Sequence, residues 1–185
     1  MDTKVLKKYE ISSSLMRLID DANDYVVLIT PYLKLWGHLT QVITTAIERG
    51  IPVSIIVRDD YSDEKKSVGY DLENTLEELE KLKVDHFVVP NLHSKLYISE
   101  KEAIMTSMNL YEHSAKENEE IGIHTTNSEL LKEIESYLED LSKRTLSYQP
   151  GMIGKLLNKL DDIRYGPSDQ GACIRCNNEL KYNLK

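Results

Sequence analysis

Four side chains that could act on a phosphate group lie between residues 91 and 123. His93 and Lys95 are two residues apart at the start of an expected strand, so their side chains leave on the same face. Ser107 and Asn109 have the same spacing at the end of the next expected strand. If the two strands form a hairpin, all four groups meet at one end of it. A neutral histidine is a nucleophile, and the ammonium, hydroxyl and amide can donate hydrogen bonds to phosphoryl oxygens.

A His-x-Lys pair alone is weak evidence, because a lysine-rich chain with five histidines has close to even odds of containing one by chance. The context is stronger. Ser107-x-Asn109 lies at the matching hairpin distance, and Asn118-x-Glu120 follows at the start of a further expected strand. The combination argues against coincidence and indicates one site.

Together these residues resemble the motif of the phospholipase D superfamily, H-x-K-x4-D-x6-G-S-x-x-N, in the single-motif form of its bacterial nuclease members. Thr30-Pro31-Tyr32, after the first expected strand, is similar to the Ser-Pro-Tyr found there in such proteins. The resemblance spans residues 8–146 and is motif-specific over 91–123. It implies a phosphodiesterase that needs no metal for catalysis.

Two positions depart from the family pattern. The aspartate of the motif falls at Glu100, or at Ser99 if the register shifts by one residue. The glycine before the serine is Thr106, where glycine lets the backbone approach closely. These departures leave open a second hypothesis, a catalytically impaired module that binds nucleic acid or associates with another protein.

The resemblance implies two-step cleavage, in which one histidine attacks phosphorus and a second protonates the leaving oxygen. The other histidines lack a lysine two residues later: His38, His86, His113 and His124. A two-fold homodimer would therefore bring two copies of His93 and Lys95 to one site, and the paired lysines would supply the positive charge. Glu120, ahead of Glu119, is expected to orient His93.

Apolar runs rich in β-branched residues alternate with amphipathic stretches as far as residue 146, which predicts an α/β domain. The resemblance narrows this to a phospholipase D-like sandwich, a mixed and mostly parallel sheet with helices on both faces. Strands are expected at 25–30, 51–58, 85–89, 95–99, 103–107 and 120–125. Helices are expected at 11–22, 38–49 before Gly50, 72–82 and 128–146 with Ser128 as N-cap, and a turn or short helix at 111–116.

Residues 147–185 are expected to form a tail of a short helix, a linker and half a metal site. Cys173 and Cys176 are spaced as C-x-x-C, like the first half of a zinc ribbon, which needs four ligands. Three interpretations remain: a chain that ends inside a structural zinc site, half a site completed elsewhere, and an incidental pair. We favour the first.

The composition restricts the partners. The chain has 185 residues with 31 acidic and 23 basic side chains, a net charge of −8, so bulk positive charge cannot drive binding to nucleic acid or an anionic membrane. A local phosphate site remains possible. We find no membrane-spanning run and no signal peptide pattern, and expect a cytoplasmic protein.

Two further residues are candidates for substrate binding. Arg58 follows an expected core strand and could hold a substrate phosphate, or form a surface salt bridge. Tyr32 and the single tryptophan, Trp36, follow another strand and could stack on a base or acyl group, or pack in the core. The leading hypothesis is a homodimeric phosphodiesterase that cleaves DNA or RNA.

Overall fold

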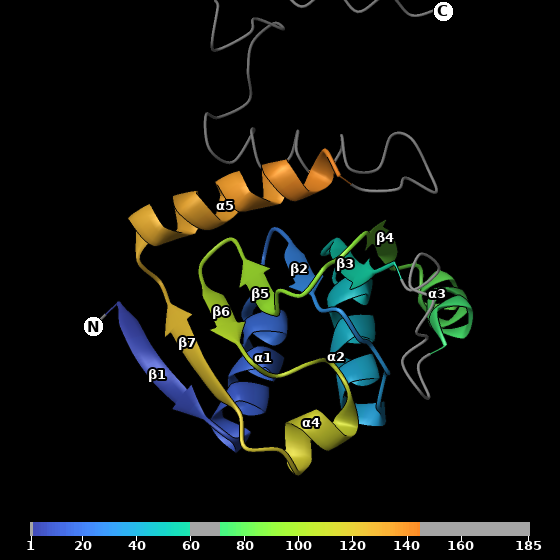
Figure 1. Ribbon diagram of the computed structural model, residues 1–185, viewed down its shortest axis with the longest axis horizontal. Coiled ribbons are helices and arrows are strands. Elements are labelled where there is room, and N and C mark those ends of the chain that lie inside the picture. Colours follow the sequence, from blue (N-terminus) through green and yellow to red (C-terminus); the bar gives the residue numbers. More distant parts are fainter. Residues whose placement is uncertain (1, 60–70, 145–185) are drawn as a thin grey trace, which may run out of the picture. The chain divides into compact units, whose positions relative to one another are not determined.

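The computed structural model describes residues 2–59 and 71–144, which all belong to one compact unit (Figure 1). The strands are β1 (Thr3–Lys7), β2 (Val26–Ile29), β3 (Val53–Arg58), β4 (Asp85–Val89), β5 (Leu96–Ser99), β6 (Ala103–Thr106) and β7 (Ile121–Thr125). The helices are α1 (Tyr9–Asp21), α2 (Gly37–Glu48), α3 (Leu72–Lys81), α4 (Glu112–Lys116) and α5 (Ser128–Ser142). The expected tail, with its cysteine pair, lies outside the described residues.

One seven-stranded sheet, in the order β1-β7-β6-β5-β2-β3-β4, forms the centre of the fold. The expected α/β class and mixed sheet are confirmed. The expectation of a mostly parallel sheet is wrong, because β2–β3 and β3–β4 pair in parallel whereas the other four pairings are antiparallel. The short turn between β5 and β6 permits a hairpin, and a parallel crossover needs a dozen or more residues.

Helices cover both faces of the sheet, as expected (Figure 1). On one face α1 and α2 pack against Leu28, Ile55 and Tyr97 in the main core cluster. The strands are apolar on both sides: all four residues of β2 are buried. α5 crosses the other face and buries Ile134, Leu138 and Leu141.

The helix ends follow from local chemistry. Gly50, with φ of 82°, ends α2 as predicted, because glycine adopts this left-handed conformation without steric cost. Asp71 caps α3 by accepting a hydrogen bond from the Asn74 amide. The expected Ser128 cap is wrong: Asn127 caps α5, and its side chain accepts from the amides of Glu129 and Leu130. The asparagine competes better because its oxygen reaches both amides.

β1 is a strand that the sequence did not predict. It has five residues, four of them exposed, and pairs antiparallel with β7 at one edge of the sheet. Leu6 alone of these side chains enters the core. Such a short, mainly polar segment has too little apolar alternation to be recognised before its partner strand is known.

Candidate active site

The sheet register brings the motif residues to one edge. Ile29 of β2 lies opposite Leu96 of β5, Leu96 opposite Met105 of β6, and Met105 opposite Ile123 of β7. The next residues outward from this row are therefore neighbours: Thr30, Lys95, Thr106 and Gly122. Two hydrogen bonds mark the same edge, from the Thr106 amide to the Lys95 carbonyl (3.1 Å) and from the Ser107 amide to the Ile121 carbonyl (3.0 Å). The predicted convergence of the two strand ends is present.

Lys95 and His93 lie at the entrance to β5. The Lys95 ammonium donates to the His93 carbonyl over 2.8 Å, and Lys95 is half-buried whereas His93 is exposed. Partial burial lowers the pKa of Lys95, and the negative charge of Glu120 opposes this effect. Among the described residues the His93 imidazole has no hydrogen-bond partner, so both ring nitrogens are available to a substrate.

Glu120 joins the hydroxyls of the site into one network. Its carboxylate accepts from the Ser107 hydroxyl, from the Ser114 hydroxyl (2.6 Å) and from the Asn118 amide (3.3 Å). Glu120, expected to orient His93, is instead bonded to these three side chains within the described part of the chain. The neighbouring Glu119 forms an exposed ion pair with Lys8. Of the two acidic candidates, Glu120 is the one bonded to a motif side chain.

Asn109 is held between this network and the end of β2. Its backbone amide donates to Ser114 Oγ over 3.2 Å, and its Oδ1 lies 3.5 Å from the Thr30 hydroxyl. Thr30 also donates to the Tyr32 carbonyl (2.9 Å) and accepts from the Leu110 amide (3.2 Å). The Thr30-Pro31-Tyr32 segment is thus bonded directly to the residues that follow β6.

Thr106, which stands at the motif's glycine position, fits its surroundings. Its hydroxyl donates to the Ile121 carbonyl over 2.9 Å and accepts from the Met108 amide over 3.1 Å. The side chain therefore holds the strand end that leads into Ser107. The threonine stabilises the edge on which the site is built.

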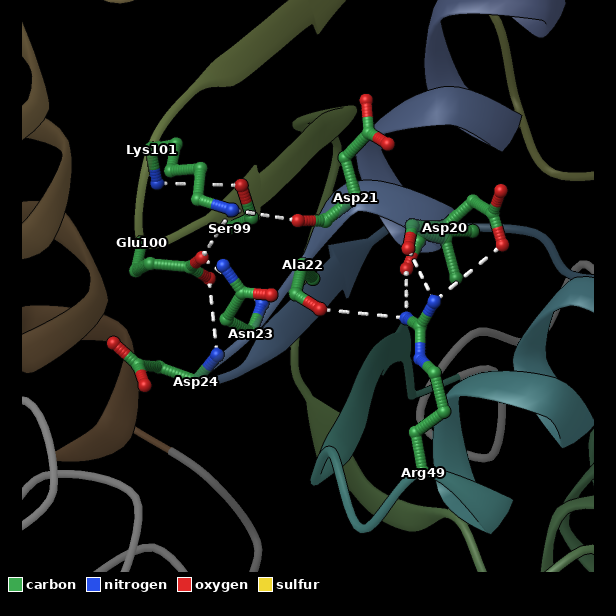
Figure 2. Close-up of polar contacts among 10 residues, drawn as sticks. Asp20, Asp21, Ala22, Asn23, Asp24, Arg49, Ser99, Glu100 and Lys101 are labelled. Atoms are coloured by element: carbon green, nitrogen blue, oxygen red, sulfur yellow. Dashed lines mark hydrogen bonds and ion pairs between the residues drawn. The ribbon is translucent and has the colours of Figure 1, made fainter.

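Glu100 anchors the far end of the hairpin (Figure 2). Its carboxylate accepts from the backbone amides of Asn23 (2.9 Å) and Asp24 (3.3 Å), which connect α1 to β2, and pairs with Lys101 (3.3 Å). Burial raises the pKa of Glu100, but the backbone amides and Lys101 outweigh it and hold the pKa below the ordinary 4.5. This residue shapes the hairpin at the end opposite to His93.

The two expected substrate-binding residues lie at the same sheet edge as the motif. The backbone amide of Arg58 donates to the Pro31 carbonyl over 3.3 Å, beside Tyr32. Both side chains are half-buried. Trp36 packs partly against the core and lines a groove of about 700 Å³ with Tyr9 and Met16 of α1.

Three participants were missed by the sequence analysis: Ser114, Tyr97 and Tyr137. Ser114 lies in a five-residue helix, where no pattern distinguishes it. Tyr97 is fully buried and donates to the Met108 carbonyl; burial first, and the charge of Glu120 second, raise its pKa well above the ordinary value. Tyr137 of α5 bonds Ser94, the residue between His93 and Lys95, over 2.7 Å. Only Tyr97 could have been suggested from the sequence, because it lies two residues after Lys95 and so on the same face of the strand.

The described residues show neither a metal-binding cluster nor a membrane-spanning helix. Over residues 2–59 and 71–144 no cluster of three or more histidine, cysteine or acidic side chains could hold a metal ion. Cys173 and Cys176 are outside these ranges, so the zinc prediction stays a prediction. No helix of the described part of the chain is long and apolar enough to cross a membrane.

Solved structures share this fold at low sequence identity. The phospholipase D family member Nuc from Salmonella typhimurium matches with a TM-score of 0.64 at 16% identity, over 80% of this chain and 100% of its own. NucT from Helicobacter pylori matches with a TM-score of 0.65 at 18% identity, over 80% of this chain and 100% of its own. Phosphatidylserine synthase from Haemophilus influenzae matches with 0.65 at 20%, over 88% of this chain and 46% of its own.

No curated protein matches the sequence. A family model does: the model described as cardiolipin synthase, PLD-like domain, matches residues 15–142, which include every motif residue from His93 to Glu120. Because this match covers more than half of the sequence, the chain belongs to the phospholipase D-like family.

Proposed function

We propose that the protein is a phosphodiesterase that cleaves nucleic acid through a phosphohistidine intermediate, at a site shared by two subunits. One observation carries the proposal: His93 is exposed, its imidazole has no hydrogen-bond partner among the described residues, and its carbonyl accepts from the half-buried Lys95 at the edge that also holds the Ser107–Glu120–Ser114–Asn109 network. A nucleophile next to fixed hydrogen-bond donors is what phosphoryl transfer requires.

In the proposed first step, a ring nitrogen of His93 attacks phosphorus. A phosphorus–nitrogen bond forms, the bond from phosphorus to the leaving oxygen breaks, and a second histidine gives that oxygen its proton. Water then attacks the phosphohistidine, gives its proton to the second histidine and releases His93. Atoms and protons balance over the two steps without a further reagent.

The second histidine is proposed to be the partner subunit's His93. The other histidines of the described chain lie elsewhere: His86 bonds the Val84 carbonyl, and His124 pairs with Glu102 on β6 and β7. His38 and His113 lie on α2 and α4. A two-fold dimer supplies a second copy of His93 in a symmetric position.

The remaining residues have distinct proposed roles. Lys95 and Asn109 donate to the non-bridging oxygens, where negative charge grows in the transition state. Ser107 joins them when its hydroxyl turns from Glu120 to the substrate. Glu120 is a positioning residue, because its carboxylate holds the Ser107 hydroxyl and, through Ser114, the Asn109 amide. Arg58 and Tyr32 extend the site along the sheet edge toward neighbouring nucleotides.

Nucleic acid is the proposed substrate because the motif resembles that of the single-motif bacterial nucleases. In addition, Nuc and NucT are matched over their whole length, whereas phosphatidylserine synthase is matched over less than half. The net charge of −8 predicts contact with few phosphates, near Lys95 and Arg58. We place the activity in the cytoplasm.

The test compares wild type, His93→Ala and His93→Gln in excess chelator. The substrates are single-stranded DNA, double-stranded DNA, RNA, a chromogenic phosphodiester and phosphatidylglycerol vesicles. We expect chelator-resistant cleavage of a nucleic acid, reduced at least ~10³-fold by either substitution. Acid-labile, alkali-stable radiolabel on the protein after quenching would identify the phosphohistidine.

Each other outcome has a definite meaning. Cleavage confined to the vesicles overturns the nucleic-acid substrate and keeps the chemistry. Cleavage that survives both His93 substitutions overturns the mechanism. DNA binding without cleavage of any substrate, in protein with intact circular dichroism, supports the alternative of a non-catalytic binding module.

A further inference from the structure

The segment between β4 and β5 carries His93 outside any strand. Within the described part of the chain, the backbones of Leu92, His93 and Ser94 form no hydrogen bond to another backbone group. A segment without backbone partners keeps its conformational freedom unless other contacts remove it. The position of His93 therefore depends on the side chains around it.

Three side chains hold this segment. Leu92 is 3% exposed and anchors the chain in the interior. The Lys95 ammonium donates to the His93 carbonyl over 2.8 Å. The Ser94 hydroxyl shares a hydrogen bond of 2.7 Å with the Tyr137 hydroxyl of α5. This last contact connects the segment to a different element, at the residue between His93 and Lys95.

α5 is a rigid support for Tyr137. Its buried side chains recur at helical spacing and fix the helix on the sheet: Ile134, Leu138 and Leu141. Asn127 caps the first turn by accepting from two backbone amides. Tyr137 directly precedes Leu138 and is 37% exposed. A side chain on a packed helix is positioned more accurately than one on a loop, so its hydroxyl is a fixed partner for Ser94.

The contact also agrees with the alternation of side chains along β5. Tyr97 enters the core on the α1 side of the sheet, and Lys95, whose carbonyl still accepts from the Thr106 amide, lies on the same side. Ser94 bonds α5, which crosses the opposite side (Figure 1). A hydrogen bond that keeps Ser94 on the α5 side therefore keeps Lys95 on the side of Tyr97 and fixes the backbone from which His93 projects.

We infer that Tyr137 is a positioning residue for the nucleophile, because its hydroxyl holds Ser94 and thereby the backbone of His93. The inference rests on the proposed function, in which His93 attacks phosphorus, and it adds the contact from α5 that fixes the histidine in place. A displacement of about 1 Å can slow such an attack ~100-fold. Global stability depends much less on this contact, since both side chains are partly exposed and water can replace the lost partner.

The test removes each hydroxyl in turn. Tyr137→Phe keeps the ring, and Ser94→Ala removes the other partner. Each is expected to lower kcat for the chromogenic phosphodiester at least ~10-fold, with KM within about twofold of the wild-type value. The double variant is expected to be no slower than either single variant, because both changes break the same hydrogen bond. Ser128→Ala, which removes an exposed hydroxyl from the same helix, is the control and is expected to leave kcat unchanged.

A second measurement does not depend on activity. The backbone ¹⁵N order parameters of His93 and Ser94 are expected at about 0.85 in the wild type and lower by at least ~0.1 in Tyr137→Phe. The order parameter of Leu96, which is paired within β5, is expected to stay the same. Thermal unfolding of each variant, followed by circular dichroism, is expected to stay near that of the wild type.

An unchanged kcat in an active enzyme overturns the inference, and so do unchanged order parameters. A change in KM alone assigns Tyr137 to substrate binding and also overturns it, as do effects that add in the double variant. A wild type that cleaves nothing overturns the proposed function. Lowered order parameters in Tyr137→Phe would then still establish that this tyrosine holds the His93 segment.

Discussion

Glu100 shows how a motif residue can serve the hairpin rather than the chemistry. Its carboxylate is 8% exposed and binds two backbone amides from the segment between α1 and β2. Glutamate has one methylene more than the aspartate of the motif and still reaches these donors. The glutamate that replaces the motif's aspartate therefore affects how the β5–β6 hairpin is attached to the end of α1.

We predict that Glu100→Gln lowers the free energy of unfolding by about 1–2 kcal/mol at pH 7, because a charged acceptor of two amides becomes neutral. Because the pKa of Glu100 is lower in the folded state, its carboxylate stabilises the fold fully above pH 4.5. This stabilisation is lost as the pH falls through the pKa of the folded state. Urea unfolding at several pH values measures this difference. It should narrow in acid, while the exposed Glu133→Gln changes little; a constant difference would contradict the assignment.

The motif residues could be predicted because their chemistry and spacing are visible in the chain. His93, Lys95, Ser107 and Asn109 lie at one sheet edge, as the hairpin argument required. The bonding of Glu120 could not be predicted, because it depends on how the chain between β6 and β7 places Ser107 and Ser114 beside this carboxylate. The hydrogen-bond partners of a carboxylate can be predicted only when the positions of all the donors around it are known.

Elements could be predicted where the pattern was long or strongly apolar. β2 and β3 are buried on both faces and were expected within a few residues of their ends. β1 was missed because its strand character arises from pairing with β7, 122 residues away at the Thr3–Thr125 hydroxyl contact. The mostly antiparallel sheet was missed for the same reason: pairing direction follows from the order of the strands.

We predict that Gly122→Ala in β7 destabilises the protein by about 2 kcal/mol or more. A Cβ there would lie 3.0 Å from the Met105 carbonyl oxygen and 3.1 Å from Thr106 Cβ, so the neighbouring β6 backbone must give by a few tenths of an ångström. Gly37→Ala in α2 is the matched control, since its Cβ meets nothing within 4 Å, and should be neutral or stabilising by up to about 1 kcal/mol. Thermal unfolding of both variants checks this, and equal effects would refute it.

At the scale of the molecule, the acidic balance and the single motif set the conditions for function. With a net charge of −8, the proposed phosphate substrate would be attracted only near local basic groups such as Lys95 and Arg58. With one His93 in each chain, the proposed two-histidine mechanism calls for two molecules at one site. The activity of the proposed enzyme should therefore depend on whether both subunits of the dimer carry His93.

Mixing experiments make this measurable. When equal amounts of wild type and His93→Ala exchange subunits freely, about a quarter of the dimers contain two histidines. We predict about a quarter of the activity of the same total amount of wild type, because a mixed dimer lacks one of the two groups. A steady-state assay across the mixing ratio should follow the square of the wild-type fraction, and a linear dependence would show that each subunit works alone.

The position of β1 also affects how the chain reaches its fold. During synthesis Thr3–Lys7 emerges first, yet its partner Ile121–Thr125 is made more than a hundred residues later. Until then Val5 and Leu6 have no strand to pair with, and closing so long a loop is slow. This edge of the sheet therefore cannot be completed before Ile121–Thr125 has been made, and until then β1 is an unpaired strand.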